Sequence, residues 1–158
     1  MTFPVINPNL VNNAQETPLQ LLCDRNHTKG YQIPDEDVIK MVKILAPLAD
    51  PKHAQNSKDS PLNLAAKFGS TEILKILLQY LDANVHHLGG FLPIDKAMFH
   101  QRIEAIKILA PFTKELRVHD FFVKYGCAKE IEVLKSLIKE RKANDLMENP
   151  NKKARLTM

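Results

Sequence analysis

Residues 60–78 read SPLNLAAKFGSTEILKILL, and this stretch carries the signals of two short helices joined by a tight turn. Ser60 can cap a helix with its hydroxyl oxygen, and Pro61 suits the first helical position because no N–H donor is needed there. Gly69 can end that helix in the left-handed conformation that glycine adopts at little cost. Beyond it, the apolar residues of 73–78 recur at helical spacing. The stretch therefore predicts a helix–turn–helix unit.

The second helix of this unit recurs along the chain as MVKILA, ILKILL, AIKILA and VLKSLI. These copies begin at positions 41, 73, 105 and 133, at steps of 32, 32 and 28 residues. A pair of short helices cannot bury its apolar faces alone, whereas about three stacked pairs share a continuous core. The period therefore predicts a repeat solenoid built from helix pairs.

Two of the copies contain the identical word KILAP, at 43–47 and 107–111. We expect the proline to end each helix, and the helix that starts near 72 to run on toward Tyr80 because it lacks that proline. We expect four apolar residues of the two words to face inward: Ile44, Leu45, Ile108 and Leu109.

The first helix of each unit starts at a recurring proline, as Thr17-Pro18, Ser60-Pro61 and Leu92-Pro93. The third start has no side-chain oxygen, so we expect it to be weaker by roughly 1 kcal/mol.

The composition is that of an ordinary globular domain. The 158 residues are 44% hydrophobic and 25% charged, and the net charge of +4 is well below that of a dedicated nucleic-acid binder. The chain has neither an apolar run long enough to span a bilayer nor a secretory signal at its start. Cys23 and Cys127 form no CxxC pair and are expected to be buried, reduced thiols. An intracellular protein is therefore expected, and the glycosylation pattern at Asn26 is interpreted as chance.

The 60–78 stretch resembles the ankyrin repeat, whose signature runs T-P-L-H-x-A-A-x-x-G-H before an apolar second helix. Asp82-Ala83-Asn84 stands where the family has D-V-N, and Gly90 where it has the loop glycine. The resemblance implies an all-α, helix–turn–helix repeat solenoid with short loop or hairpin connections. It also implies a non-catalytic module that binds another protein on its concave and finger surface.

The expected domain covers 14–140, between a flexible arm at 1–13 and a basic, disordered tail at 141–158. Its four repeats are expected at 15–50, with an insertion at 24–37, and at 56–82, 88–114 and 117–140.

The chain departs from the ankyrin pattern at several points. Gln20, Asn63 and Asp95 replace the family's histidine, so its hydrogen bonds must be rewired, and Gln101-Arg102 replaces the step after glycine. The last repeat lacks the Thr-Pro start, and we expect Asp120 to cap its first helix.

An aromatic and basic set occupies positions that line the concave face and the finger tips in ankyrin repeats. Exposed aromatic side chains on a rigid surface are typical anchors of protein interfaces. The alternative is that Phe91 or Phe99 fills core space in the irregular third repeat. The expected partner-binding residues are Lys67, Phe68, His86, Phe91, Phe99 and His100.

No set of reactive groups converges in the sequence, so no catalytic, cofactor-binding or metal-binding residues are expected. Cys23 and His27, four residues apart, would share a helix face but lack a second ligand pair. Asp35-Glu36-Asp37 is interpreted as the acidic start of a helix, and His86-His87 as part of an inter-repeat finger. The rival hypothesis is an enzyme, or its accessory domain, with a pocket built by the insertion.

The basic residues near the C-terminus resemble a bipartite nuclear-import signal, although they also suit a solubilising tail, a carboxylate-presenting end or a non-specific phosphate contact. By resemblance, Asn84 lies where some ankyrin repeats are hydroxylated. We expect a cytoplasmic monomer that acts as an adaptor or as a stoichiometric inhibitor. The alternative is an inhibitor of a transcription factor or kinase that acts in the nucleus. The residues of the import signal are Arg141, Lys142, Lys152, Lys153 and Arg155.

Overall fold

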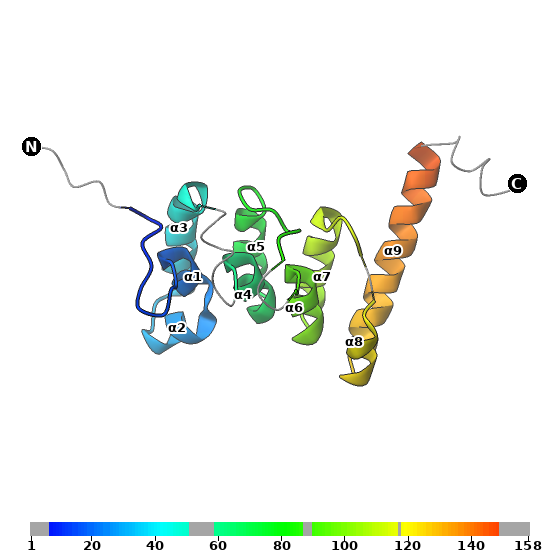
Figure 1. Ribbon diagram of the computed structural model, residues 1–158, viewed down its shortest axis with the longest axis horizontal. Helices are drawn as coiled ribbons and strands as arrows, with labels where there is room; N and C mark the ends of the chain where they lie inside the picture. The colour runs from blue at the N-terminus through cyan, green and yellow to red at the C-terminus, as the bar shows by residue number, and fades with distance from the viewer. Residues whose placement is uncertain (1–6, 51–58, 87–89, 117, 149–158) are drawn as a thin grey trace, which may run out of the picture.

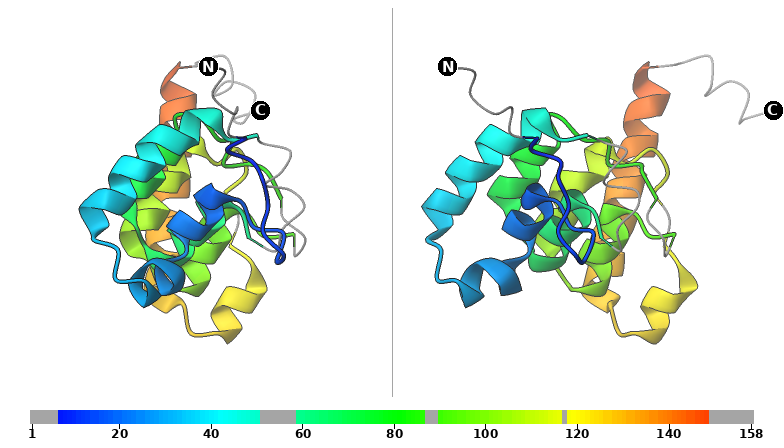
Figure 2. Two further views of the ribbon diagram at one scale, coloured as in Figure 1. Left: turned by 90° about the vertical axis from the view of Figure 1, so that its left-hand side faces the viewer. Right: turned by 60° about the vertical axis from the view of Figure 1, so that its left-hand side comes forward.

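The helices come in pairs that stack side by side, as the computed structural model shows for residues 7–50, 59–86, 90–116 and 118–148 (Figure 1). Seen along the stack, the pairs form two layers (Figure 2). The inner layer contains α1 (Pro18–Cys23), α4 (Pro61–Phe68), α6 (Pro93–Phe99) and α8 (Asp120–Lys124). The outer layer contains α3 (Asp35–Leu45), α5 (Thr71–Leu77), α7 (Ile103–Leu109) and α9 (Ala128–Glu148). None of the described residues lies in a strand, so the predicted all-α repeat solenoid is confirmed.

We number the units one to four along the chain, each with one inner and one outer helix. The first unit holds an extra helix, α2 (Arg25–Gly30), within the insertion predicted at 24–37. Asp24 ends α1 and caps α2, because its carboxylate accepts the N–H of Asn26 at 2.9 Å.

Each unit reverses its direction through one residue in the left-handed region. These residues are Gln32 (φ 54°), Gly69 (φ 70°), Gln101 (φ 57°) and Gly126 (φ 75°). In every case the next residue donates its N–H to the carbonyl five positions earlier, at 2.8–3.1 Å. The four bonds run from Ile33 to Thr28, Ser70 to Ala65, Arg102 to Ala97 and Cys127 to Phe122. The turn predicted at Gly69 is therefore a Schellman motif that all four units share.

The helix starts differ as their cap residues predict. The hydroxyl oxygens of Thr17 and Ser60 accept the N–H groups of the third helical residues, at 3.3 and 3.0 Å. Leu92 has no such oxygen, but the carboxylate of Asp95 reaches back and accepts the N–H of Leu92 at 2.9 Å. One half of a capping box therefore remains at the start of α6.

The residues that replace the family's histidine divide into two kinds. Gln20 donates through Nε2 to the carbonyl of Asp59 at 2.8 Å, and Asp95 pairs with His119 at 3.6 Å, so both link one unit to the next. Asn63 is fully buried, and its side chain has no hydrogen-bond partner among the described residues.

The repeated word KILAP ends its helices as predicted. The α-helices stop at Leu45 and Leu109, and one 3₁₀ turn follows each, η1 (Ala46–Leu48) and η3 (Ala110–Phe112). The expectation that α5 runs on to Tyr80 is wrong, because that helix ends at Leu77 and continues as turns.

The inward orientation predicted for KILAP holds for Leu109, which is fully buried, and in part for Leu45 and Ile108. It is wrong for Ile44, which is 65% exposed. Ile76, the equivalent residue of α5, is buried. Among the described residues, no helix precedes α3 in the outer layer to cover Ile44.

The expected flexible arm is docked over residues 7–13, and residues 1–6 lie outside the described part. Asn9 donates through Nδ2 to the carbonyl of Leu48 at 2.9 Å and accepts the N–H of Asp50 at 2.8 Å. Asn84 does the same in the third unit, at 2.9 Å to Phe112 and 2.7 Å from Lys114. The two asparagines therefore form equivalent clamps on the turns that follow α3 and α7.

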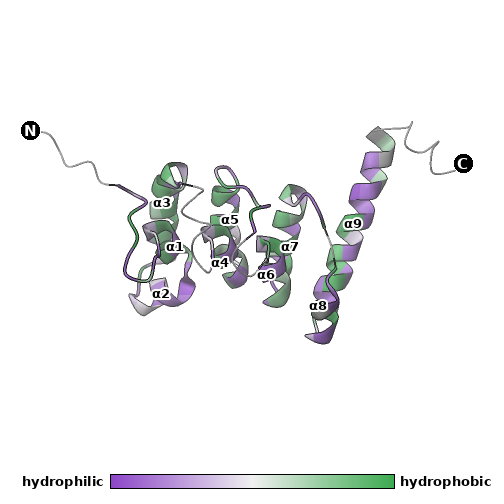
Figure 3. Ribbon diagram, viewed as in Figure 1, coloured by the Kyte–Doolittle hydropathy of each residue, from purple (hydrophilic) through white to green (hydrophobic). Residues whose placement is uncertain are grey.

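The disordered tail predicted at 141–158 is wrong for 141–148, because α9 remains helical to Glu148. Arg141 donates to the carbonyls of Thr113 (2.7 Å), Lys114 (3.3 Å) and Ala110, which tie α9 to the end of α7. The upper part of α9 is hydrophilic (Figure 3). Asp120 is the first residue of α8 and not its predicted N-cap.

Truncating Leu77 to alanine is expected to lower the free energy of unfolding by about 2–5 kcal/mol, because that leucine is fully buried between the layers. Ile44→Ala is the matched control from the same sequence pattern, and it should change stability by less than about 0.5 kcal/mol. Urea denaturation followed by circular dichroism measures both. A tolerated Leu77→Ala would mean that the repeat alignment is wrong.

The Asn84 clamp has its own test. Asn84→Ala removes two hydrogen bonds to the next turn and should lower the free energy of unfolding by about 1–2 kcal/mol. Asn144→Ala, on the exposed face of α9, should leave it within about 0.5 kcal/mol. Equal effects of the two variants would show that the clamp adds nothing to stability.

Candidate protein-binding surface

A cavity of about 290 Å³ opens between α6 and the residues that follow α8, and we call it the aromatic groove. It exists because α8 has only five residues and packs mainly against α9, which leaves one side of α6 uncovered. Phe91, Phe99 and Tyr125 are 38%, 46% and 61% exposed, too much for core-filling side chains. The rings of Phe99 and Tyr125 meet edge to face, with centroids 5.5 Å apart. The lining residues are Phe91, Asp95, Lys96, Phe99, His100 and Tyr125.

Basic side chains surround the groove. Lys96 pairs with Asp59 at 2.7 Å and lies over the ring of Phe91, 5.9 Å from its centroid. Arg102 donates through Nε to the carbonyl of Lys67 at 3.1 Å, which brings two cations together where α4 and α6 end.

The pKa of His100 is lowered by its surroundings in the groove. Partial burial lowers the pKa of His100, and the positive charges of Lys67, Lys96 and Arg102 lower it further, while Asp59 opposes them. The imidazole is therefore biased toward the neutral form, and the positive potential of the groove comes from the lysines and the arginine.

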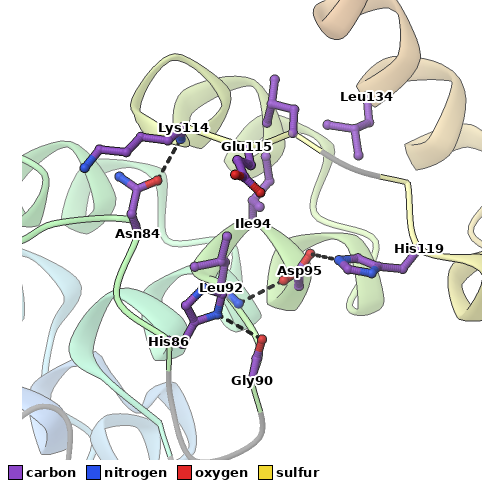
Figure 4. Close-up of a pocket in the computed structure, with 11 residues that line it drawn as sticks. Asn84, His86, Gly90, Leu92, Ile94, Asp95, Lys114, Glu115, His119 and Leu134 are labelled. Carbon is purple, nitrogen blue, oxygen red and sulfur yellow. Dashed lines mark hydrogen bonds and ion pairs between the residues drawn. The ribbon is translucent and has the colours of Figure 1, made fainter.

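A second cavity, of about 560 Å³, lies between the finger loop before α6 and the start of the fourth unit (Figure 4). His86 contacts the carbonyl of Gly90 through Nδ1 at 3.2 Å, and Nε2 of His119 pairs with the buried carboxylate of Asp95 at 3.6 Å. The residues that line this finger cavity include no hydroxyl or thiol that such a pair could activate.

The family model described as ankyrin repeats, in three copies, matches residues 33–120. The chain belongs to the ankyrin repeat family. Ankyrin repeats are protein–protein interaction modules, and the family is generally non-catalytic. No curated protein matched the chain. Among the described residues, no helix combines the length and the apolar composition needed to cross a bilayer.

The ankyrin stack brings together only part of the predicted partner-binding set. Phe91, Phe99 and His100 line the aromatic groove, and Lys67 lies close enough to His100 to influence its pKa. Phe68 lies elsewhere, because its half-buried ring packs against the core and lines a cavity beside α2. His86 lines the finger cavity instead.

Three residues of the groove, Asp95, Lys96 and Tyr125, were not in the predicted partner-binding set. A signal for Tyr125 exists, because an aromatic ring precedes the left-handed residue of every turn. The four are Tyr31, Phe68, His100 and Tyr125. Since the fourth unit lacks the Thr-Pro start, its first helix could not be aligned well enough to show this.

A separate row of exposed apolar side chains follows the outer layer. Leu48, Tyr80 and Phe112 recur at steps of 32 residues, after the C-terminal ends of α3, α5 and α7, and each is about half exposed. This outer row shares no residue with the aromatic groove, so it provides control positions for experiments on the groove.

The metal half-site considered for Cys23 and His27 does not form. The two residues lie on different helices, Cys23 is fully buried with its pKa raised by that burial, and His27 stacks on Tyr31. Within the described ranges, no three His, Cys, Asp or Glu side chains come together as metal ligands would.

Three predictions remain: the nuclear-import signal, the finger residue His87 and the hydroxylation of Asn84. Of the predicted import signal, Lys142 is exposed and Arg141 is hydrogen-bonded to the three carbonyls at the end of α7. Its other residues, Lys152, Lys153 and Arg155, lie outside the described residues, and so does His87 of the finger. Hydroxylation of Asn84 stays a prediction.

We expect the free energy of unfolding to fall as the pH drops below 6.5. The unfolded chain binds a proton on His100 near its ordinary pKa of 6.5, whereas the lowered pKa makes the folded chain bind it only at lower pH. His100→Gln should flatten this part of the pH dependence, measured by urea denaturation between about pH 7.5 and 5.5. Parallel stability curves for the two proteins would contradict the expectation.

Proposed function

We propose that this protein is a non-catalytic binding module that holds a partner protein on the inner face of its ankyrin stack. The aromatic groove supports the proposal best, because it exposes Phe91, Phe99 and Tyr125 on a rigid scaffold beside several cations. Aromatic anchors surrounded by polar groups are the usual centre of a protein interface.

The proposed mode of action is surface complementarity, in which the groove anchors the partner and neighbouring residues such as Lys67 and His86 extend the contact. A small monomeric stack of this kind suits an adaptor or a stoichiometric inhibitor in the cytoplasm. An inhibitor of a transcription factor or kinase in the nucleus is the alternative, and it relies on the basic C-terminal residues. An accessory domain of an enzyme complex is a further alternative, with the cavity beside the insertion at 24–37 as its contact.

Affinity capture tests the proposal. Wild type and Phe99→Ala/Tyr125→Ala would be compared by quantitative mass spectrometry, with Tyr80→Ala as the matched aromatic control on the outer row. We expect the double variant to capture about tenfold less of the specific partner, or less still, because it lacks two anchors of the interface. The control should capture as much as the wild type does.

The three proteins should have the same helical content and similar melting temperatures, because each of the three side chains is about half exposed or more. Capture lost only with Tyr80→Ala would move the interface to the outer row. A captured enzyme that stays active when saturated indicates an adaptor; stoichiometric loss of its activity indicates an inhibitor.

A further inference from the structure

We infer that the aromatic groove accepts one large apolar side chain from an acidic segment of the partner protein. The inference rests on the proposed function and names the chemistry of the partner at that site.

The groove suits a single side chain. Its volume of about 290 Å³ lies below the range of about 300–1,000 Å³ that is typical of small-molecule pockets. Phe91, Phe99 and Tyr125 supply its exposed apolar surface. A leucine, methionine or phenylalanine side chain can pack among three such rings and be largely removed from water, which gives the contact its affinity.

The charges around the groove select an acidic neighbour for that anchor. Three cations act on His100, from Lys67, Lys96 and Arg102, against one opposing carboxylate, Asp59. Asp59 is paired with Lys96. Lys67 and Arg102 have no carboxylate partner within the part of the chain that the structure describes, so their charge remains available to a ligand.

The remaining acid of the groove does not cancel this potential. Asp95 is buried, accepts the N–H of Leu92 at 2.9 Å and lies 3.6 Å from Nε2 of His119, so its carboxylate already has partners within the fold. Both available cations lie beside the end of α4, where Nζ of Lys67 is 5.2 Å from the centroid of the Phe68 ring and Arg102 donates to the carbonyl of Lys67.

The position of Arg102 is fixed by its surroundings. Its guanidinium Nε donates to the carbonyl of Lys67, and its aliphatic part packs where a side chain at Gly69 would stand, with Cδ 3.0 Å from the point that a Cβ would occupy. A cation held in place in this way loses little freedom when it meets a carboxylate, and electrostatic complementarity contributes specificity and association rate more than affinity.

Single-stranded nucleic acid could also combine stacking on aromatic rings with cations. The observations favour a peptide, because the rings enclose one cavity and do not form a row along which successive bases could stack. The experiment includes this alternative as an outcome.

Selection from a random twelve-residue peptide library displayed on phage tests the inference with the full chain as bait. We expect the selected peptides to share one large apolar residue with Asp or Glu within a few positions of it. Synthetic peptides of the consensus would then be measured by fluorescence anisotropy, together with a fluorescent oligothymidine as the nucleic-acid probe.

Variants separate the two parts of the inference. Phe99→Ala/Tyr125→Ala should lower the affinity for the consensus peptide about tenfold or more, whereas Tyr80→Ala should leave that affinity unchanged. Lys67→Glu should weaken it about threefold to tenfold, most clearly at low salt, whereas Lys75→Glu on the outer layer should have no effect. Unchanged melting temperatures would show that all variants are folded.

The inference is overturned by a consensus that lacks acidic residues, by peptides insensitive to Phe99 and Tyr125, or by groove-dependent binding of the oligothymidine alone. Failure of the proposed function looks different. If the acidic peptides bind the groove but no cellular protein is captured through it, the peptide chemistry holds and the proposed function fails. If capture depends on the groove but the consensus is not acidic, the function holds and this inference fails.

Discussion

The hydrogen bond across each left-handed turn is the constraint on which the rest of the stack depends. In every unit the residue after Gln32, Gly69, Gln101 or Gly126 bonds to the carbonyl five positions earlier, whatever the neighbouring sequence. In the second, third and fourth units this bond fixes the angle at which the outer helix leaves the inner one, and in the first unit it fixes the angle at which α3 leaves the extra helix α2. It also fixes where the preceding aromatic residue stands, which is how the fold carries Tyr125 to the edge of the groove.

Only two of the four turns use glycine. Glutamine in the left-handed conformation costs roughly 1–2 kcal/mol, so Gln32 and Gln101 are held there by the packing of their units. The third unit adds a helix start without a hydroxyl cap, and the fourth has a short inner helix. The aromatic groove and the finger cavity both lie beside those irregular units. Departures from local rules therefore occur beside the candidate binding surface, as is common at functional sites, and also in the first unit at Gln32 and the insertion.

The period, the helix caps and the glycine turn could all be predicted from the sequence, because each is a local pattern that repeats. What could not be predicted depends on neighbours in space. Ile44 follows the same pattern as Ile76 but lacks a preceding helix, and the helix through 141–148 is fixed by Arg141 reaching back to the end of α7. Likewise, Phe68 and Phe99 look alike in sequence, but Phe68 directly precedes the left-handed residue of its turn whereas Phe99 stands one position earlier, so the two rings point in different directions and only Phe99 lines the groove.

The asparagine clamps explain why the first unit can differ so much in length from the third. Asn9 reaches Leu48 across 39 residues and Asn84 reaches Phe112 across 28, and the eleven additional residues of the first unit fall within the range 24–37 that was predicted to hold the insertion and that contains α2. The same two bonds form in both cases, because the additional residues leave the stack at one end of the helix pair and the clamp holds the other. New segments can therefore be gained or lost at the α2 position while the spacing of the repeats stays constant. A lineage could change that end of the stack freely without disturbing the groove four helices away.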